Sequence, residues 1–168
     1  ILTHYGASMR PKALTDQVVV MVQKFIERFT DPNDRIVLFY SGMSGVASAT
    51  ALTTVISVAT DAVPSIASLV YVRKEHERSH GEPIEISVLN DIEPTDRLIP
   101  IFIDDFICSG DTFLYVKKQV AKYRKKYNGL FYSEDENCKQ FHNKLSLKKN
   151  WWIVEVDRGS LKRAHEVI

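Results

Sequence analysis

Hydrophobic and polar residues follow two helical patterns and one apolar stretch that is also long enough for a helix. Between Ala13 and Phe29, apolar residues recur every three or four positions, which predicts an amphipathic helix. The stretch from Phe113 to Tyr127 repeats this pattern, with Lys and Arg crowded into its last turns, where the helix dipole favours cations. The Ala-rich stretch from Val46 to Thr60 predicts a buried helix, although its β-branched residues lower helix propensity.

Shorter apolar runs predict strands. The continuous run at 36–40 is typical of a strand covered on both faces, and the runs at 66–72, 98–103 and 151–156 also predict strands. The run at 84–89 partly alternates and predicts a half-exposed strand. We place Pro100 at the first position of its strand, because proline lacks a donor for the ladder. Strands that alternate with helices predict an α/β fold, with a mostly parallel central sheet flanked by helices.

The composition fits an ordinary globular protein. The chain has 168 residues, 45% of them hydrophobic and 26% charged, with a net charge of +1, which predicts a single domain over residues 1–168 with a real core. There is no basic excess to indicate nucleic acid, no apolar stretch of the ~18–20 residues that a membrane span needs, and no signal-peptide pattern. Cys108 and Cys138 form no disulfide or metal framework, so a reduced, cytoplasmic location is expected.

The richest candidate site follows the strand at 98–103. Two adjacent carboxylates, Asp104 and Asp105, precede a turn of small residues, Cys108–Thr112, and then a helix. A turn that opens a helix after a strand is the usual place for phosphate in an open α/β sheet, because free N–H groups, hydroxyls and the helix dipole all favour an anion. The carboxylates would repel bare phosphate, so they suit ribose hydroxyls or a hydrated Mg²⁺. The plainer alternative is an ordinary strand, acidic turn and helix.

Three other stretches carry candidate chemistry. Ser41-Gly42-Met43 follows an earlier strand, and Gly42 would let a ligand approach the backbone closely. Residues 72–81 form a charged run that predicts a mobile loop, or else a plain solvated surface. This run contains H-E-x-x-H, but nothing apolar would dock such a helix, so a zinc protease is disfavoured. Arg158 follows the last strand and suits a substrate carboxylate, or else pairs with Asp157.

The acid pair with Ser109-Gly110-Asp111-Thr112 resembles the PRPP-binding motif of the type I phosphoribosyltransferases. The run at 72–81 and the Asp-Arg pair are most similar to orotate phosphoribosyltransferases. The resemblance implies the type I fold with a small hood. It also implies that Asp104 and Asp105 bind the ribose hydroxyls and coordinate Mg²⁺, directly or through water. It also implies three sets of ligand contacts: the 5-phosphate on Cys108, Ser109, Gly110, Asp111 and Thr112; pyrophosphate on Ser41, Gly42 and Met43 under a closing loop with Arg73, Lys74, Arg78 and His80; and the base on Ile107 and Arg158.

The function implied by this resemblance is Mg²⁺-dependent transfer of ribose 5-phosphate from PRPP to a nitrogenous base, with release of pyrophosphate, by a homodimer. The base stays open, with an orotate-like pyrimidine favoured, since Cys108 stands where 6-oxopurine enzymes carry an Asp. Two departures, Ser41 in place of a frequent cation and one extra residue in the charged run, leave a second hypothesis, a PRPP-binding regulator without turnover. An unrelated nucleotide-binding α/β domain is the third.

Overall fold

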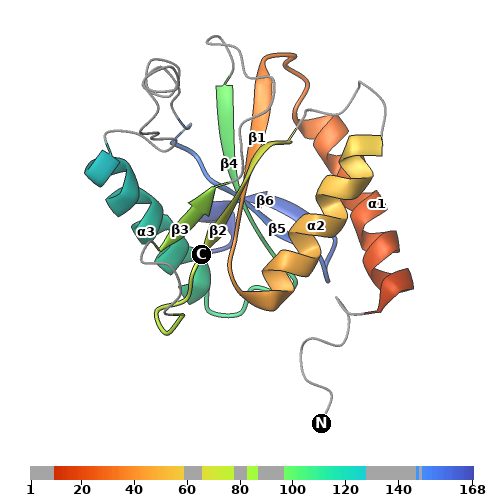
Figure 1. Ribbon diagram of the computed structural model, residues 1–168. Helices are drawn as coiled ribbons and strands as arrows, with labels where there is room; N and C mark the ends of the chain where they lie inside the picture. The colour runs from red at the N-terminus through yellow and green to blue at the C-terminus, as the bar shows by residue number, and fades with distance from the viewer. Residues whose placement is uncertain (1–9, 59–65, 78–82, 87–96, 128–146, 148) are drawn as a thin grey trace.

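Six strands form one sheet in the order β3-β2-β1-β4-β5-β6. The structure is a computed structural model that describes residues 10–58, 66–77, 83–86, 97–127, 147 and 149–168. Its elements are α1 (Pro11–Arg28), β1 (Asp34–Tyr40), α2 (Gly42–Val58), β2 (Ile66–Val72), β3 (Ile84–Ile86), β4 (Arg97–Asp104), α3 (Asp111–Tyr127), β5 (Trp152–Glu155), β6 (Ser160–Arg163) and the 3-10 turn η2 (Ala164–Glu166). The four central strands are parallel and the edge strands β3 and β6 are antiparallel, which confirms the predicted α/β class with a mostly parallel sheet (Figure 1).

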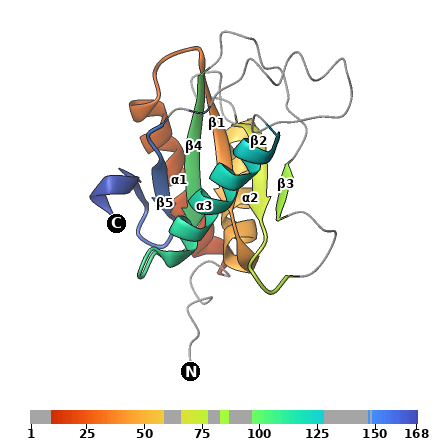
Figure 2. The same cartoon turned by 90° about the vertical axis from the view of Figure 1, so that its left-hand side faces the viewer.

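Helices cover both faces of this sheet. α1 and α2 lie on one face and α3 lies on the other, as Figure 2 shows with the strands between them. In β1, Ile36 and Leu38 pack into the core under α1 and α2, whereas Val37 and Phe39 pack into the core under α3. Both faces therefore need apolar side chains, which explains why this strand reads as a continuous apolar run rather than an alternating one.

The chain order gives the sheet a switch point between β1 and β4. From β1 the chain passes through α2 to β2 on one side, whereas β4, on the other side of β1, leads through α3 to β5. α2 and α3 therefore leave these two strands toward opposite faces, at the lower edge of the sheet in Figure 1. In open α/β sheets, the crevice at the carboxyl ends of the strands beside such a point is the usual ligand site. The candidate residues after β1 and β4 lie at this place.

Two sequence predictions need correction. α2 begins at Gly42, not at Val46, because Gly42 has a φ of 70° and turns the chain from the strand directly into the helix. Pro100 lies at the fourth position of β4, not at its first. β5 pairs with β4 only from Ile101 onward, so the proline precedes the part of the strand that is paired with both neighbours.

The hairpin formed by β5 and β6 was not predicted. β6 returns along β5 after a turn in which Gly159 has a φ of 54°. The sequence of β6, Ser-Leu-Lys-Arg, has too few apolar residues to read as a strand. Residues 87–89 of the predicted third strand, and most of the segments 1–12 and 129–150 from which a hood was expected, lie outside the described residues.

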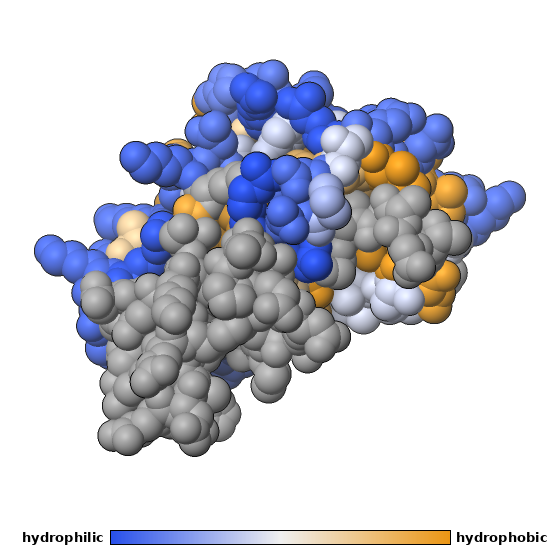
Figure 3. Space-filling model, turned by 90° about the horizontal axis from the view of Figure 1, so that it is seen from above, coloured by the Kyte–Doolittle hydropathy of each residue, from blue (hydrophilic) through white to orange (hydrophobic). Residues whose placement is uncertain are grey.

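The amino-terminal edge of the sheet lies opposite the candidate site. Seen from that edge in Figure 3, the described surface is mainly hydrophilic, and hydrophobic residues gather on the side of α1 and α2. None of the described helices combines the length and the apolar character that crossing a membrane requires.

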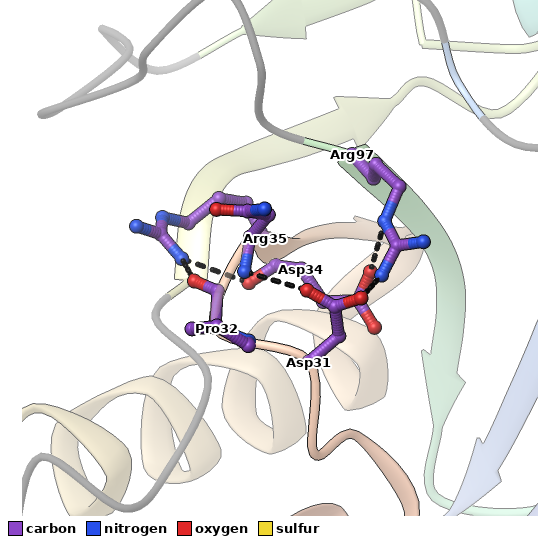
Figure 4. Close-up of polar contacts among 6 residues, drawn as sticks. Asp31, Pro32, Asp34, Arg35 and Arg97 are labelled. Atoms are coloured by element: carbon purple, nitrogen blue, oxygen red, sulfur yellow. Dashed lines mark hydrogen bonds and ion pairs between the residues drawn. The ribbon is translucent and has the colours of Figure 1, made fainter.

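An arginine joins the starts of the two central strands at this edge (Figure 4). Arg97, the first residue of β4, forms ion pairs with Asp31 and with Asp34, whose Oδ1 lies 3.2 Å from Arg97 Nε. The Arg97 N–H also donates to the Asn33 carbonyl at 2.8 Å. Asp34 is buried, so its carboxylate depends on such partners, and the contact fixes where β4 starts relative to β1.

We expect Arg97→Ala to lower the free energy of unfolding by about 1–3 kcal/mol, because a buried carboxylate loses a charged hydrogen-bond partner. Urea denaturation monitored by circular dichroism measures this difference. Lys118→Ala, at an exposed position of α3, is the control and should change stability by no more than about 0.5 kcal/mol. Equal effects of the two substitutions would contradict this role of Arg97.

Candidate functional site

The acid pair lies at the carboxyl end of β4, beside the start of α2. Asp104 and Asp105 are 8% and 7% exposed. Asp104 Oδ1 accepts a hydrogen bond from the Ser44 hydroxyl at 2.8 Å and another from the Asp105 N–H at 2.9 Å. Asp105 Oδ1 accepts one from the Phe106 N–H at 2.8 Å. These donors hold both carboxylates in place, and the Ser44 bond spans the switch point between α2 and β4.

A hollow of about 120 Å³ joins the first acid to the small-residue turn. Its lining residues are Asp104 and the segment from Phe106 to Phe113, which includes the whole turn Cys108–Thr112. The structure thus brings together the carboxylate and the turn that the sequence singles out. Asp104 has little exposed surface, but it forms part of the wall of this hollow and is within reach of a ligand there.

The turn itself has a defined shape. Gly110 has a φ of 83°, a left-handed conformation that favours glycine, and its carbonyl accepts from the Leu114 N–H at the start of α3. The Ser109 hydroxyl donates to Asp111 Oδ2 at 2.7 Å, and Ser109 Oγ accepts from the Asp111 N–H at 3.3 Å. The Ser109 hydroxyl is thus engaged by Asp111 inside the turn, and a phosphate would have to compete with this contact.

The environment of Asp104 changes its acidity. Burial raises the pKa of the Asp104 carboxyl from an ordinary 3.8 to about 7; the hydrogen bond from Ser44 lowers it and the neighbouring Asp105 carboxyl raises it. A carboxyl group that titrates near neutral pH at the end of a strand is typical of functional sites. Its ionised form could stabilise developing positive charge, and either form could bind a hydroxyl.

A third buried acid, which the sequence analysis missed, organises the end of β5. Glu155 is 3% exposed, and its Oε2 accepts from the Ile107 N–H at 3.1 Å and lies 3.6 Å from Arg158 Nη1. The Arg158 guanidinium also lies over the Phe106 ring, 5.1 Å from its centre. Glu155 therefore holds the two predicted base contacts, Ile107 and Arg158, close together. The only signal in the sequence was one acid inside an otherwise apolar run.

The first charged residue of the run at 72–81 does not lie free in a loop. Arg73 is buried, forms an ion pair with Glu85 of β3, and donates its N–H to the Pro83 carbonyl at 2.9 Å. Among the residues of this run, Arg78 and His80 lie outside the described part of the chain. In the conformation described, Arg73 belongs to the end of the sheet rather than to a mobile segment.

The next residues form a turn closed by a carboxylate. Glu77 accepts from the Lys74 N–H at 3.1 Å and from the Tyr71 hydroxyl at 2.6 Å. Burial and the Glu77 contact raise the pKa of Tyr71 to about 12, and the Tyr71 hydrogen bond lowers the pKa of Glu77. His76 lies in this turn and not in a helix, as a zinc protease would require. No group of three potential metal ligands occurs among the residues that the structure describes.

Comparisons with known proteins add little to this geometry. No family model and no curated protein sequence matches the chain. Among solved structures, the chain is similar to the orotate phosphoribosyltransferase of Francisella tularensis, with 15% identity and a TM-score of 0.45 over 68% of this chain and 46% of that chain. The chain thus spans less than half the length of that enzyme.

We expect Ser44→Ala to raise the pKa of Asp104 further, by about one pH unit, because the ionised carboxylate loses a hydroxyl donor. Titration of the carboxyl carbons by NMR measures the shift directly. Ser44→Thr keeps the hydroxyl and should leave the titration where it is. An unchanged midpoint in the alanine variant would show that this hydrogen bond does not stabilise the ionised form.

The raised pKa of Asp104 also predicts how stability changes with pH. The folded pKa lies above that of the unfolded chain, so ionisation of Asp104 destabilises the fold as pH rises from about 4 to about 7, and the loss persists at higher pH. At pH 8, Asp104→Asn should therefore unfold roughly 8–16 °C above the wild type, equivalent to on the order of 4 kcal/mol for a shift of about three pH units, and the gap should shrink toward pH 4. Exposed Glu27→Gln is the control, and a gap independent of pH would contradict the assignment.

Proposed function

We propose that this protein binds PRPP at the crevice between β1 and β4 and transfers its ribose 5-phosphate to a nitrogenous base, with release of pyrophosphate. The observation that carries the proposal is the hollow lined by both Asp104 and the turn Cys108–Thr112. A turn that opens a helix suits a phosphate, whereas a carboxylate suits sugar hydroxyls. A sugar phosphate presents both groups in one molecule.

The 5-phosphate would bind at the turn Cys108–Thr112. The backbone N–H groups at the start of α3 and the partial positive charge of this helix favour an anion there. The Ser109 hydroxyl would exchange its contact with Asp111 for one with phosphate. Since this exchange involves only exposed side chains, it requires no change in the core.

The acid pair would hold the ribose hydroxyls and steady the reacting carbon. As the bond to pyrophosphate breaks, positive charge develops on the ring, and an ionised Asp104 would stabilise it in a partly buried site. Asp104 and Asp105 also fit a magnesium ion that is carried by the substrate, because Mg²⁺ takes one or two carboxylates together with phosphate oxygens and water. When bound, this ion would neutralise charge on the pyrophosphate.

The remaining site residues stay predictions. Pyrophosphate would lie at Ser41-Gly42-Met43, and the charged run would supply Lys74, Arg78 and His80 as cations. Arg73 could join them only by leaving Glu85. The ion pair between Arg73 and Glu85 also favours the second candidate, a PRPP-binding regulator without turnover, because it commits one of the expected cations to structure.

The base would lie near Ile107 and Arg158. Glu155 contacts both the Ile107 N–H and the Arg158 guanidinium, so the guanidinium lies close to Ile107 and would offer hydrogen-bond donors to a heterocycle bound there. An orotate-like pyrimidine remains the first base to test, since Arg158 suits a carboxylate. The homodimer also stays a prediction.

Pyrophosphate release from PRPP and Mg²⁺ across a panel of pyrimidine and purine bases tests the proposal. With the accepted base, Asp104→Asn combined with Asp105→Asn should lower the rate by at least about 100-fold, since preorganised charge stabilisation is lost. Lys118→Ala should behave as the wild type.

The outcomes separate the hypotheses. Normal turnover by the double variant would exclude the acid pair from the reaction. Tight PRPP binding without turnover on any base would favour the regulator, and equal affinity for PRPP and unrelated phosphates would favour a different nucleotide-binding domain.

A further inference from the structure

Gly110, in the small-residue turn before α3, is covered by the side chain of Ile168, which follows β6 and η2. Cys108, Ser109 and Asp111 of this turn are exposed, whereas Gly110 is buried. A Cβ at Gly110 would lie 2.7 Å from Ile168 Cδ1, 2.9 Å from Ile168 Cγ1 and 3.3 Å from Ile168 Cγ2. The isoleucine side chain therefore lies directly against the backbone of the turn, in the space that any side chain at residue 110 would need.

The segment that carries Ile168 is fixed to the rest of the fold. The Ala164 N–H donates to the Trp151 carbonyl at 2.9 Å, and the N–H groups of Val167 and Ile168 both donate to the Ala164 carbonyl at 3.1 Å. The side chains of Ala164 and Val167 pack against the core under α3. In Figures 1 and 2 this end of the chain, marked C, lies beside the start of α3. A hydrogen-bonded and packed segment thus presents Ile168 to the turn.

Ile168 contacts the turn without occupying the hollow. The lining residues of the hollow are Asp104 and the segment from Phe106 to Phe113, and Ile168 is not among them. Gly110 has a φ of 83°, and its carbonyl accepts from the Leu114 N–H at 3.0 Å in the first turn of α3. The contact of Ile168 with Gly110 therefore restricts the backbone that forms the wall of the hollow, and it does so from outside.

We propose that Ile168 is a positioning residue for the 5-phosphate, because it holds the turn Cys108–Thr112 in the conformation that would bind this anion. This inference rests on the proposed function and deepens it. Glycine has access to many backbone conformations, so Gly110 by itself does not fix the turn. Packing of Ile168 on Gly110 removes part of this freedom before a ligand arrives, and a site that is ordered in advance binds its ligand more tightly.

Ile168 can be substituted without disturbing the core. Its side chain is 45% exposed, so truncating it leaves no enclosed cavity. Ile168→Ala removes all three carbons that face Gly110, whereas Ile168→Val keeps the two Cγ atoms. Val58→Ala, at a position of α2 that is 81% exposed, is the matched control for the loss of a surface aliphatic group.

Amide hydrogen exchange measured by NMR tests the inference without any ligand. In Ile168→Ala the Leu114 N–H should exchange at least about threefold faster, because its acceptor on Gly110 is held less firmly. The Val120 N–H, later in α3, should exchange as in the wild type, since the change is local to the turn. Ile168→Val and Val58→Ala should match the wild type at both positions.

Isothermal titration of ribose 5-phosphate and of inorganic pyrophosphate, each with Mg²⁺, measures the effect on binding. Ile168→Ala should weaken ribose 5-phosphate binding by about 3- to 10-fold, the loss expected when one group must be ordered on binding. Pyrophosphate, whose proposed place is the turn after β1, should bind within about twofold of the wild-type affinity. Ile168→Val should restore ribose 5-phosphate binding to within about twofold of the wild type.

Three results would overturn the inference. The first is unchanged exchange of the Leu114 N–H in Ile168→Ala, and the second is an equal loss of affinity for both ligands, which would indicate a general effect on folding. The third is tighter ribose 5-phosphate binding, which would show that Ile168 blocks the turn. Each of these leaves the proposed function standing if the wild type turns over PRPP. A wild type that binds neither PRPP nor ribose 5-phosphate would instead remove the proposed function, and this inference with it.

Discussion

The parallel pairing of β1 with β4 in the middle of the sheet fixes where the candidate site lies. It runs from Asp34 opposite Arg97 to Phe39 opposite Phe102 and is buried on both faces. Because both strands end at the same edge while their following helices leave toward opposite faces, a ligand crevice is expected at this place. The hydrogen bond between Ser44 and Asp104 joins the start of α2 to the end of β4 there.

Three buried carboxylates lie at this edge of the sheet, where they are stabilised by backbone hydrogen bonds. Asp104, Asp105 and Glu155 each accept a hydrogen bond from a backbone N–H. Such bonds offset part of the loss of hydration, but the raised pKa of Asp104 indicates that the compensation is incomplete. The Asp104 carboxylate therefore lowers the stability of the fold. A destabilising group at the end of a strand is expected where binding or catalysis requires it.

The local elements were largely readable from the chain, since local order depends on neighbouring residues. The runs at 36–40 and 66–72 predicted β1 and β2, and the apolar stripe of Phe113, Val116 and Val120 predicted the buried side of α3. The errors occurred where tertiary context overrides local preference. Pro100 was tolerated inside β4 because β5 starts later, and β6 formed from a polar segment because β5 offers it an edge.

The fold class, the acid pair and the turn before α3 were predictable from the residues alone, because each depends on residue types at short spacing. The residues that contact them became known only from the folded arrangement. Ser44 reaches Asp104 across 60 positions, Glu155 reaches Ile107 across 48, and Lys74 reaches Gly42 from the turn that follows β2. Strand order and register set these contacts. They arise from packing the whole sheet, so no local pattern along the chain contains them.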